Sequence, residues 1–367
     1  MEVFRMRFPV DPWVKKLVFH AYAPFGWARA PNHVSLDLTR RCNLRCRMCF
    51  YYGGEARESP QLNELSAREI VSRVVSRLEG ADYDLTGGEP LVRNDLPEIL
   101  SAIRDRGARC AVTTNGTLMT PELAARVVGE ALLTAAHFSL HGLKGNHEGI
   151  TRAPSSFDRT VKGIHSILNE RARRGAARPE VTIACTLTGA NLKDAGGMIR
   201  LAREAGVDRI TFGHASFMPP GAQGVHRDFL GRRGLAPDPA YDDLVQGPPE
   251  IPAEPGELES YIEALSAARR CPEGAGVGTS PEGYGADEIR RHYLDFTWKF
   301  RSACAYPWRN LRIGPDGTVT PCVGYVIGNV RERDVRELWN DGRFRKFRAT
   351  LYRNRLFPGC LRCCKLK

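Results

Sequence analysis

The sequence predicts an α/β protein, a partial (β/α)6 barrel of the TIM type followed by a small C-terminal domain of a hairpin and a helix. Short apolar strand patterns alternate with amphipathic helix patterns between residues 33 and 214, which is typical of a parallel sheet. Polar residues follow the strands, where the functional loops of such barrels lie. A Pro-Asp-Gly turn signal at 315–317 separates two further strand-like runs and predicts the hairpin.

The predicted elements follow one another along the first 214 residues. The run "HVSLDL" alternates apolar and polar residues and predicts the first strand. The pattern "SARE" is a capping box that begins the first helix, and Thr120-Pro121 begins a later one. The other predicted strands are "ADYDLT", 110–116, 135–142, 180–189 and 208–214, and the helices include 156–174 and 194–205.

Motifs and composition divide the chain into four parts. We expect an N-terminal extension over 1–30, the partial barrel over 31–216 and a C-terminal domain over 304–367. Residues 217–303 carry ten of the 24 prolines, which predicts a loop-rich insertion on the substrate side, with helices near 257–270 and 286–302.

The formal charge of +11 and the pI of about 9.2 suit an anionic partner, although solvated arginines explain the same balance. No run of 18 apolar residues appears, and the N-terminus lacks the apolar core of a secretory signal. We therefore expect a cytoplasmic protein with reduced thiols, in which clustered cysteines bind metal.

Three cysteines, Cys42, Cys46 and Cys49, form a C-x3-C-x2-C array in "TRRCNLRCRMCF". Residues 39–60 contain no fourth Cys or His, whereas a structural zinc requires four ligands. A [4Fe–4S] cluster has four irons, so three cysteines leave one iron open. Open metal positions are where substrates bind, so the array predicts a catalytic cluster.

A second set of cysteines lies near the C-terminus. Cys304 and Cys322 flank the predicted hairpin, and Cys360 and Cys363 form a C-x2-C pair. Four thiolates are the full set for a structural zinc or a closed iron–sulfur cluster, and both interpretations stay open. Cys364 is a possible substitute for Cys363.

The array after the first strand, "GGEP" after the second, "TTNG" after the third and "SLHG" after the fourth together resemble the radical S-adenosylmethionine (SAM) enzymes over about residues 30–215. The resemblance implies a [4Fe–4S] cluster on Cys42, Cys46 and Cys49 that binds SAM and cleaves it to a 5′-deoxyadenosyl radical, which abstracts hydrogen from a substrate. It implies that the residues that bind SAM are Met48, Gly87, Gly88, Glu89, Thr114, Asn115, Ser139 and Thr186. Met48 departs from the family, where an aromatic residue is common.

The C-terminal pattern resembles the SPASM/twitch domains appended to such barrels, in the shorter twitch form. That resemblance implies one auxiliary [4Fe–4S] cluster on Cys304, Cys322, Cys360 and Cys363, and a flavodoxin or ferredoxin-type electron donor. An auxiliary cluster fits an oxidation of the substrate, in which one electron must leave. His141 and His214 lie at the C-terminal ends of predicted strands and are candidate acid–base residues, although a hydrogen-bonding role explains them as well.

We expect the substrate to be a small polar, anionic metabolite such as a sugar, nucleotide or aminocyclitol, which is oxidised or rearranged. A ribosomal peptide is the alternative, and a lipid is a third option because "WVKKLVFHAYAPFGW" (13–27) is amphipathic and basic enough to contact a membrane. The non-enzymatic alternatives are an iron–sulfur electron carrier and a zinc-dependent nucleic-acid binder. No interleaved basic and aromatic pattern on a known fold indicates nucleic acid.

Overall fold

The computed structural model describes residues 19–49, 63–214, 216–218, 221–235, 255–271, 273–295, 297–322 and 325–363. No helix in these ranges is long and apolar enough to cross a membrane. Part of the amphipathic segment 13–27 and the whole of Cys364 lie outside the described residues.

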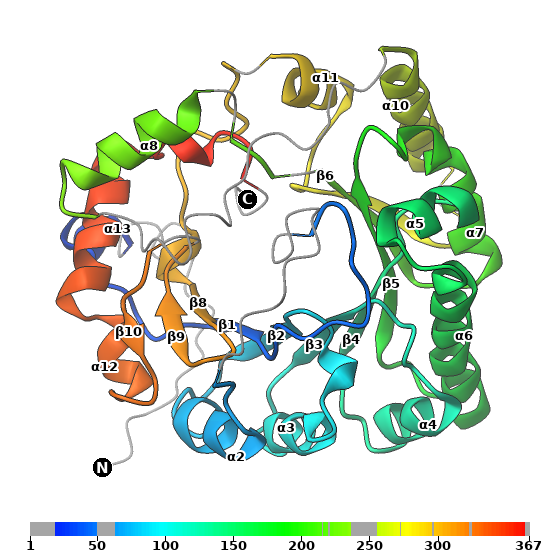
Figure 1. Ribbon diagram of the computed structural model, residues 1–367, viewed down its shortest axis with the longest axis horizontal. Coiled ribbons are helices and arrows are strands. Elements are labelled where there is room, and N and C mark those ends of the chain that lie inside the picture. The colour runs from blue at the N-terminus through cyan, green and yellow to red at the C-terminus, as the bar shows by residue number, and fades with distance from the viewer. Residues whose placement is uncertain are drawn as a thin grey trace.

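One curved sheet organises the described residues, with the strand order β10-β9-β8-β1-β2-β3-β4-β5-β6-β7 (Figure 1). The strands from β8 through β1 to β7 pair in parallel, and β9 and β10 add antiparallel pairs at one edge. Their bounds are β1 (His33–Asp37), β2 (Asp82–Thr86), β3 (Cys110–Thr114), β4 (Ala135–Ser139), β5 (Glu180–Leu187), β6 (Arg209–His214), β7 (Gly276–Ser280), β8 (Asn310–Ile313), β9 (Thr318–Thr320) and β10 (Gly328–Asn329).

Helices cover the outside of this sheet (Figure 1). The helices are α2 (Ala67–Ile70), the π-helical turn η2 (Val71–Val75), α3 (Leu96–Arg104), α4 (Pro121–Gly129), α5 (Lys144–Thr151), α6 (Ser156–Arg174), α7 (Ala195–Glu204), α8 (Ala222–Gly231), α10 (Pro255–Arg270), α11 (Ala286–Leu294), α12 (Val335–Trp339) and α13 (Gly342–Asn354). Short 3-10 turns are η1 (Ala23–Phe25), η3 (Pro90–Val92), η4 (Leu192–Asp194), η5 (Tyr306–Trp308) and η6 (Pro358–Cys360).

The two faces of each strand differ in character. Because successive side chains point to opposite faces, Val34 and Leu36 of β1 pack into the helix-covered core while His33, Ser35 and Asp37 face the concave side. The same alternation holds in β2, where Tyr83 and Leu85 are buried in the core. The concave side therefore forms a lumen, and polar side chains reach it.

The six predicted strand–helix units are all present, and the "SARE" capping box forms at Ser66 and Glu69. The turn at 315–317 joins β8 to β9 as predicted. The predicted helix after the hairpin is two helices, α12 and α13, which are separated at Asn340-Asp341.

In the described part of 217–303, the two predicted helices are present as α10 and as α11, which ends at Leu294 rather than near 302. Helix α8 and the strand β7, which pairs in parallel with β6 and extends the sheet, were not predicted. Glycines at 276 and 278 weaken the strand pattern in the sequence, so β7 escaped prediction. The C-terminal segment also joins the sheet, because β8 pairs with β1.

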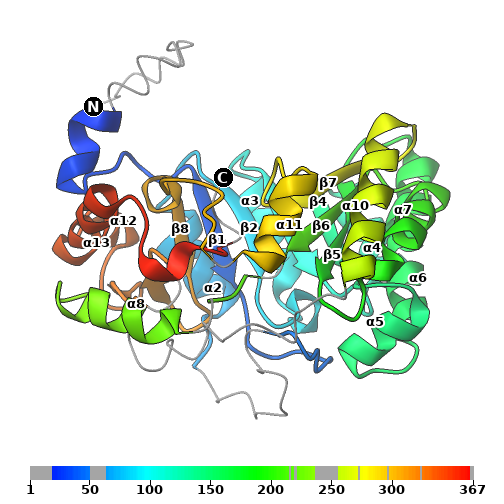
Figure 2. The same ribbon diagram turned by 90° about the horizontal axis from the view of Figure 1, so that it is seen from above.

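The C-terminal helices pack against the segment that precedes β1, and Figure 2 shows both at the same end of the molecule. Arg348 of α13 is fully buried and donates hydrogen bonds to the carbonyl oxygens of Gly26, Pro307 and Trp339. Its guanidinium also lies over the Trp339 ring, 4.0 Å from the centroid. This one side chain therefore joins three separate segments of the chain.

Candidate active site at the ends of the parallel strands

The cysteine loop begins directly after β1 and carries three half-buried thiols. Burial, together with the neighbouring Cys49 and Cys42 thiols, raises the pKa of the Cys46 thiol to about 12. The Cys49 amide donates to the Cys46 carbonyl at 3.1 Å, which closes a turn between the last two cysteines. The Cys42 and Cys46 thiols, whose pKa values are raised mainly by burial, form with Cys49 a donor set that a bound metal cluster would deprotonate.

The Gly87-Gly88-Glu89 turn after β2 lies against the start of this loop. The Gly88 amide donates to the Thr39 carbonyl at 2.6 Å, and the Glu89 amide donates to the Arg41 carbonyl at 2.9 Å. A Cβ atom at position 88 would lie 2.3 Å from the Arg41 carbonyl oxygen. Gly87 has a φ of +137° and would meet the Thr39 carbonyl oxygen at 2.5 Å. Both glycines are therefore required for the close approach of two backbones.

The Glu89 side chain is buried and binds groups of the protein itself. Its residue is 1% exposed, and its carboxylate accepts hydrogen bonds from the Thr114 hydroxyl at 2.6 Å and from the Asn115 amide at 2.7 Å. The Leu91 amide donates to the same carboxylate at 2.9 Å. Glu89 therefore ties the turn after β2 to the end of β3. Thr114 points into the core with it, away from the lumen.

The Asn115 side chain connects the Glu89–Thr114 contact to the cysteine loop. Its amide nitrogen donates to the Asn43 side-chain oxygen at 2.9 Å and lies 4.0 Å from the Cys42 sulfur. Asn43 in turn donates to the Thr117 hydroxyl at 2.8 Å. The two loops are thus joined side chain to side chain beside Cys42.

Two residues that the sequence did not single out also hold the loop. The Glu64 carboxylate accepts from the Thr39 hydroxyl at 2.7 Å and from the Arg40 amide at 3.0 Å. The buried Arg93 donates to the carbonyl oxygens of Leu38 and Leu65 at 2.8 and 2.9 Å. The sequence feature that could have indicated Arg93 is its position, three residues after the Gly-Gly-Glu-Pro turn and just before an apolar helix pattern. An arginine that is buried at such a place needs hydrogen-bond partners.

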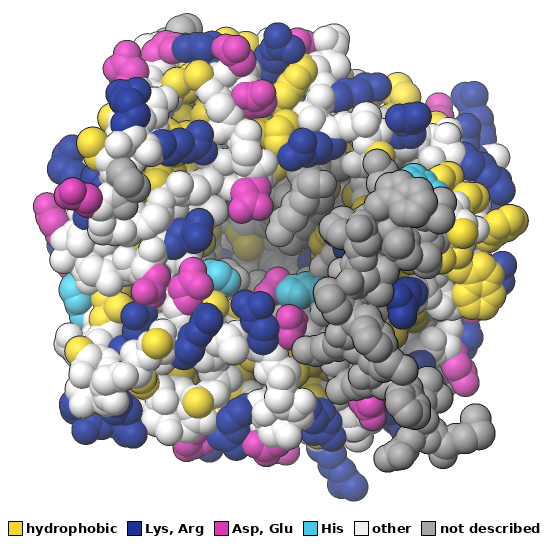
Figure 3. Space-filling model, turned by 180° about the vertical axis from the view of Figure 1, so that it is seen from behind, with side chains coloured by type: hydrophobic (Ala, Val, Ile, Leu, Met, Phe, Trp, Pro, Cys, Tyr) yellow, Lys and Arg dark blue, Asp and Glu magenta, His cyan; other side chains and the backbone are white. Residues whose placement is uncertain are grey.

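The lumen beneath the loop contains charged side chains from strands far apart in the sequence. Arg312 of β8 forms an ion pair with Asp37 of β1 at 2.7 Å, and the ring nitrogen Nε2 of His33 lies 2.6 Å from the Asp84 carboxylate of β2. The Arg312 side chain is 28% exposed but that of Asp37 only 5%, so the cation is the accessible member of its pair. Figure 3 shows a hollow on the face opposite to that of Figure 1, with histidine, acidic and basic side chains at its edge.

The opposite wall of the lumen has few side chains. Thr211 and Gly213 of β6 lie beside Gly278 and Ser280 of β7, and the pairing of the strands puts these four residues on one face. A Cβ atom added at Gly213 or Gly278 would approach no atom closer than 3.6 Å, so packing does not require glycine there. Glycine within a strand is typical of a place where a ligand or a backbone approaches closely.

The second set of thiols comes from three segments that meet beside β9. Burial, with a smaller contribution from the Cys322 thiol, raises the pKa of Cys304 to about 12. Burial also raises the pKa of Cys360, with further contributions from Cys322 and Cys304. The Cys363 amide donates to the Cys360 carbonyl at 3.3 Å, which places both ends of the C-x2-C pair in one turn.

Comparison with known proteins decides the identity of this arrangement. The model of the radical SAM superfamily matches residues 36–171, and that of the SPASM iron–sulfur cluster-binding domain matches residues 304–364. The chain belongs to the radical SAM superfamily. It is an enzyme with a [4Fe–4S] cluster, SAM and an auxiliary iron–sulfur cluster as cofactors.

Similar radical SAM proteins cover most of the chain. Fe-coproporphyrin III synthase of Methanosarcina barkeri is 25% identical over 332 residues, which are 83% of this chain and 72% of that protein. PqqA peptide cyclase of Xanthomonas campestris is 24% identical over 345 residues, 90% of this chain and 79% of that protein. The structure of Streptococcus suis SuiB bound to S-adenosylmethionine superposes with a TM-score of 0.62 at 15% identity and covers 91% of this chain and 72% of SuiB, which supports the fold.

The residues present fit these cofactors. Cys42, Cys46 and Cys49 are three thiols on one loop, and Cys304, Cys322, Cys360 and Cys363 are the four described thiols of the C-terminal domain. Within the described ranges, no three Cys, His, Asp or Glu side chains are arranged as ligands of a single metal ion. The assignment of each cysteine to its cluster stays a prediction.

The other residues expected to contact SAM fall into two groups. Ser139 and Thr186 are the last lumen-facing residues of β4 and β5, which keeps them available to a bound molecule. Met48 is half-buried within the cysteine loop. Glu89 and Thr114, in contrast, bind each other in the core.

The two candidate acid–base histidines are buried and have other partners. The ring of His141 accepts a hydrogen bond from the Thr186 amide at 3.2 Å, and burial lowers its pKa to about 3. His214 points into the core, where it lies 3.0 Å from the Tyr293 hydroxyl and 3.3 Å from the Tyr261 hydroxyl. Burial lowers the pKa of His214 well below its usual range. Both histidines are thus kept neutral, and their positions favour the hydrogen-bonding role.

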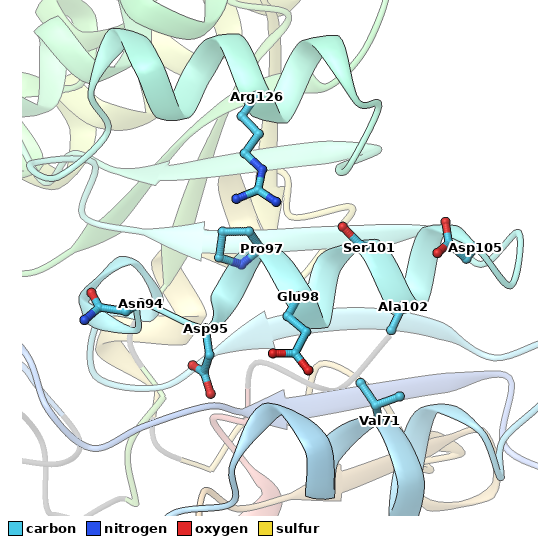
Figure 4. A pocket seen from close by; sticks show the side chains of 9 residues that line it. All are labelled: Val71, Asn94, Asp95, Pro97, Glu98, Ser101, Ala102, Asp105 and Arg126. Atoms are coloured by element: carbon cyan, nitrogen blue, oxygen red, sulfur yellow. The ribbon is translucent and has the colours of Figure 1, made fainter.

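A separate groove lies on the outside of the barrel among α3, α4 and η2 (Figure 4). Arg126 of α4 points across it toward Pro97 and Glu98 of α3. Its lining comes from outer helix surfaces and contains none of the cysteines. We therefore keep it apart from the radical SAM site.

Proposed function

We propose that this radical SAM enzyme abstracts hydrogen from a small anionic molecule, one that carries carboxylate or phosphate groups and binds in the lumen of the barrel. The observation that carries the proposal is the position of Arg312. It faces the lumen and is the more exposed member of its ion pair with Asp37. Arginine binds carboxylate and phosphate with two parallel hydrogen bonds, so an anionic substrate can take over part of this pairing.

The two glycines on the β6–β7 side of the lumen, Gly213 and Gly278, are an argument for a wide substrate. Gly213 and Gly278 add no side chain to the β6–β7 side of the lumen, where Thr211 and Ser280 contribute small ones, opposite the charged side of β1, β2 and β8. A ring system can lie against that wall while its acidic groups reach Arg312. The name of Fe-coproporphyrin III synthase gives a tetrapyrrole as the product of that similar enzyme, and a broad ring system of this kind would suit the lumen.

The chain's own residues hold the reacting groups in place. When bound, the first cluster supplies the electron that cleaves SAM to methionine and the 5′-deoxyadenosyl radical, and the auxiliary cluster supplies an acceptor for the electron that an oxidised product must lose. Glu89 and Asn115 fix the cysteine loop relative to β3, and Ser139 and Thr186 offer hydroxyls from the lumen wall. Fixed geometry of this kind lowers the entropy cost of hydrogen abstraction.

A peptide is the second candidate substrate. PqqA peptide cyclase aligns with 90% of this chain, which is more than Fe-coproporphyrin III synthase does. A peptide would have to enter the same lumen, and its acidic side chains could use Arg312. The electron donor that we propose is a flavodoxin or ferredoxin-type protein, and we propose the cytoplasm as the compartment.

The test compares substrates by the extra 5′-deoxyadenosine that they induce. Anaerobically reconstituted protein is given SAM and dithionite with iron coproporphyrin III, GTP or a PqqA-type peptide, and 5′-deoxyadenosine is quantified. We expect an anionic small molecule to stimulate its formation in wild type and much less in Arg312→Gln. Stimulation by the peptide alone would replace the first candidate by the second, and no 5′-deoxyadenosine under any condition would contradict radical SAM activity.

A further inference from the structure

We propose that Arg362 is a positioning residue for the auxiliary iron–sulfur cluster, because it locks the C-x2-C turn that contains it to the end of helix α11. The inference rests on the proposed ligand set, in which Cys360 and Cys363 are ligands. Arg362 lies between these two cysteines in the sequence and is only 2% exposed.

The guanidinium of Arg362 binds backbone rather than carboxylate. Its Nε donates to the His292 carbonyl oxygen at 2.7 Å, and its Nη2 donates to those of Arg291 and Asp295. Its Nη1 donates to the Trp298 carbonyl oxygen at 2.8 Å. Four carbonyl groups between residues 291 and 298 therefore converge on one side chain.

Arg291 and His292 belong to the last turn of α11, which ends at Leu294, and Asp295 and Trp298 belong to the segment that follows it. The last four carbonyl groups of a helix have no partner within the helix, and the end carries a partial negative charge. A buried cation at this position satisfies both requirements. Removal of the guanidinium would take this donor from the His292 and Trp298 carbonyl oxygens, and the turn would lose its attachment, whereas the Arg291 and Asp295 carbonyl oxygens would still accept the amides of Asp295 and Trp298.

The attachment bears directly on the thiols. Cys360 and Cys363 are within two residues of Arg362, and the Cys363 amide is bonded to the Cys360 carbonyl. Cys304 and Cys322 come from another segment, before and after the β8–β9 hairpin. The relative position of the two halves of the ligand set depends on how the C-x2-C turn is held. Arg362 holds it from α11, and the Gly359 amide, which donates to the His226 ring, holds it from α8.

Arg362 also brings a positive charge close to the cluster. A [4Fe–4S] cluster with four thiolates is an anion, and reduction adds one more negative charge. A nearby buried cation stabilises the reduced form more than the oxidised form, and therefore raises the reduction potential. A purely structural arginine elsewhere in the domain would not affect that potential.

Arg348 is the matched control. It is also fully buried, donates to backbone carbonyl oxygens and stacks on aromatic rings, but its partners are Gly26, Pro307 and Trp339. Its substitution should destabilise the same domain without releasing the C-x2-C turn.

The experiment uses the full chain with Cys42→Ala, Cys46→Ala and Cys49→Ala, so that only the auxiliary cluster forms. This parent should bind about four irons after anaerobic reconstitution. Arg362→Gln, Arg362→Lys and Arg348→Gln are made in it. The readouts are iron and sulfide per chain, the rate of iron loss to a chelator, and the midpoint potential from a redox titration followed by electron paramagnetic resonance.

We expect Arg362→Gln to lose iron roughly ten-fold faster than the parent, in line with other residues that support metal ligands. Its midpoint potential should become more negative. Arg362→Lys should also lose iron faster, since an ammonium cannot reach four carbonyl groups, but its potential should stay near that of the parent because the charge is kept. Arg348→Gln should match the parent in both properties, even where it lowers the melting temperature of the protein.

Two results would overturn the proposal. One is that Arg362→Gln keeps the iron-release rate and the potential of the parent. The other is that Arg348→Gln changes both as much as Arg362→Gln does. A parent that binds no iron would refute the ligand set itself, while 5′-deoxyadenosine formation by the wild-type enzyme would still test the proposed function separately. Where Arg362→Gln does not fold, Arg362→Lys and its iron-release rate decide.

Discussion

The Thr114 hydroxyl donates a 2.6 Å hydrogen bond to the buried carboxylate of Glu89, and this contact joins the end of β3 to the turn after β2. The turn in turn binds the backbone of the cysteine loop through the amides of Gly88 and Glu89. Removal of the Glu89 carboxylate should therefore change the position of the cysteine loop, although Glu89 itself lies in the core.

Glu89→Gln should destabilise the protein by about 1–3 kcal/mol, the cost of a buried donor left without its acceptor. The glutamine amide can accept at one oxygen only, and it brings an NH2 group toward the Asn115 and Thr114 donors. Urea unfolding of the metal-free protein measures the change. Glu98→Gln on the exposed surface of α3 is the control, and an equal effect of the two variants would contradict the assignment.

Gly88→Ala should disrupt the cysteine loop, because the new Cβ would meet the Arg41 carbonyl oxygen at 2.3 Å. Backbone atoms cannot move aside as a flexible side chain can, so iron retention by the first cluster should fall roughly ten-fold. Iron release to a chelator is the measurement. Gly145→Ala on α5 adds the same methyl group where nothing lies within 4 Å, and it should behave as wild type.

Gly278→Leu should separate SAM cleavage from substrate turnover. A leucine on the β6–β7 wall would fill part of the lumen but lies on a different strand from the cysteine loop. We expect 5′-deoxyadenosine formation without substrate to remain within about two-fold of wild type, while the stimulation by substrate is lost. Unchanged stimulation would show that this wall is not part of the substrate site.

Acid should weaken the contact between the C-terminal domain and the barrel. Hydrogen bonds from Arg331 lower the pKa of Glu69 from 4.5 to about 2. Because the folded state has the lower pKa, the stabilisation is fully present above pH 4.5 and is lost as the pH falls toward 2. Glu69→Gln should therefore lose less stability than wild type over this interval, measured by urea unfolding at each pH, and parallel curves would contradict the linkage.

The sequence predicted the elements of the barrel because each carries a local signal. The capping box at Ser66, the Thr120-Pro121 start and the C-x3-C-x2-C array depend on neighbouring residues, and the structure has all the predicted strand–helix units. The pairing of β8 with β1 joins residues 33–36 to residues 310–313, which are far apart in the sequence, so no local pattern predicts it.

The direction of side chains at the strand ends was harder to predict. Thr114 and Ser139 are both polar residues at the end of a strand, yet Thr114 faces the core and Ser139 the lumen. A shift of one residue in a strand reverses the face, and strand ends are the least certain positions in a sequence. The contact of Glu89 with SAM stays a prediction, and the hydrogen bond of its carboxylate to Thr114 joins residues 25 positions apart, which no local pattern predicts.

The pairing of β1 with β8 also constrains how the chain is made. Until residues 310–313 have been synthesised, β1 is an edge strand whose free amide and carbonyl groups can pair with another molecule. The part of the chain before β8 therefore leaves the ribosome with β1 as an unpaired edge strand. A fragment that ends before β8 should therefore aggregate unless a chaperone covers the edge of β1, even though it contains the strands β1 to β7.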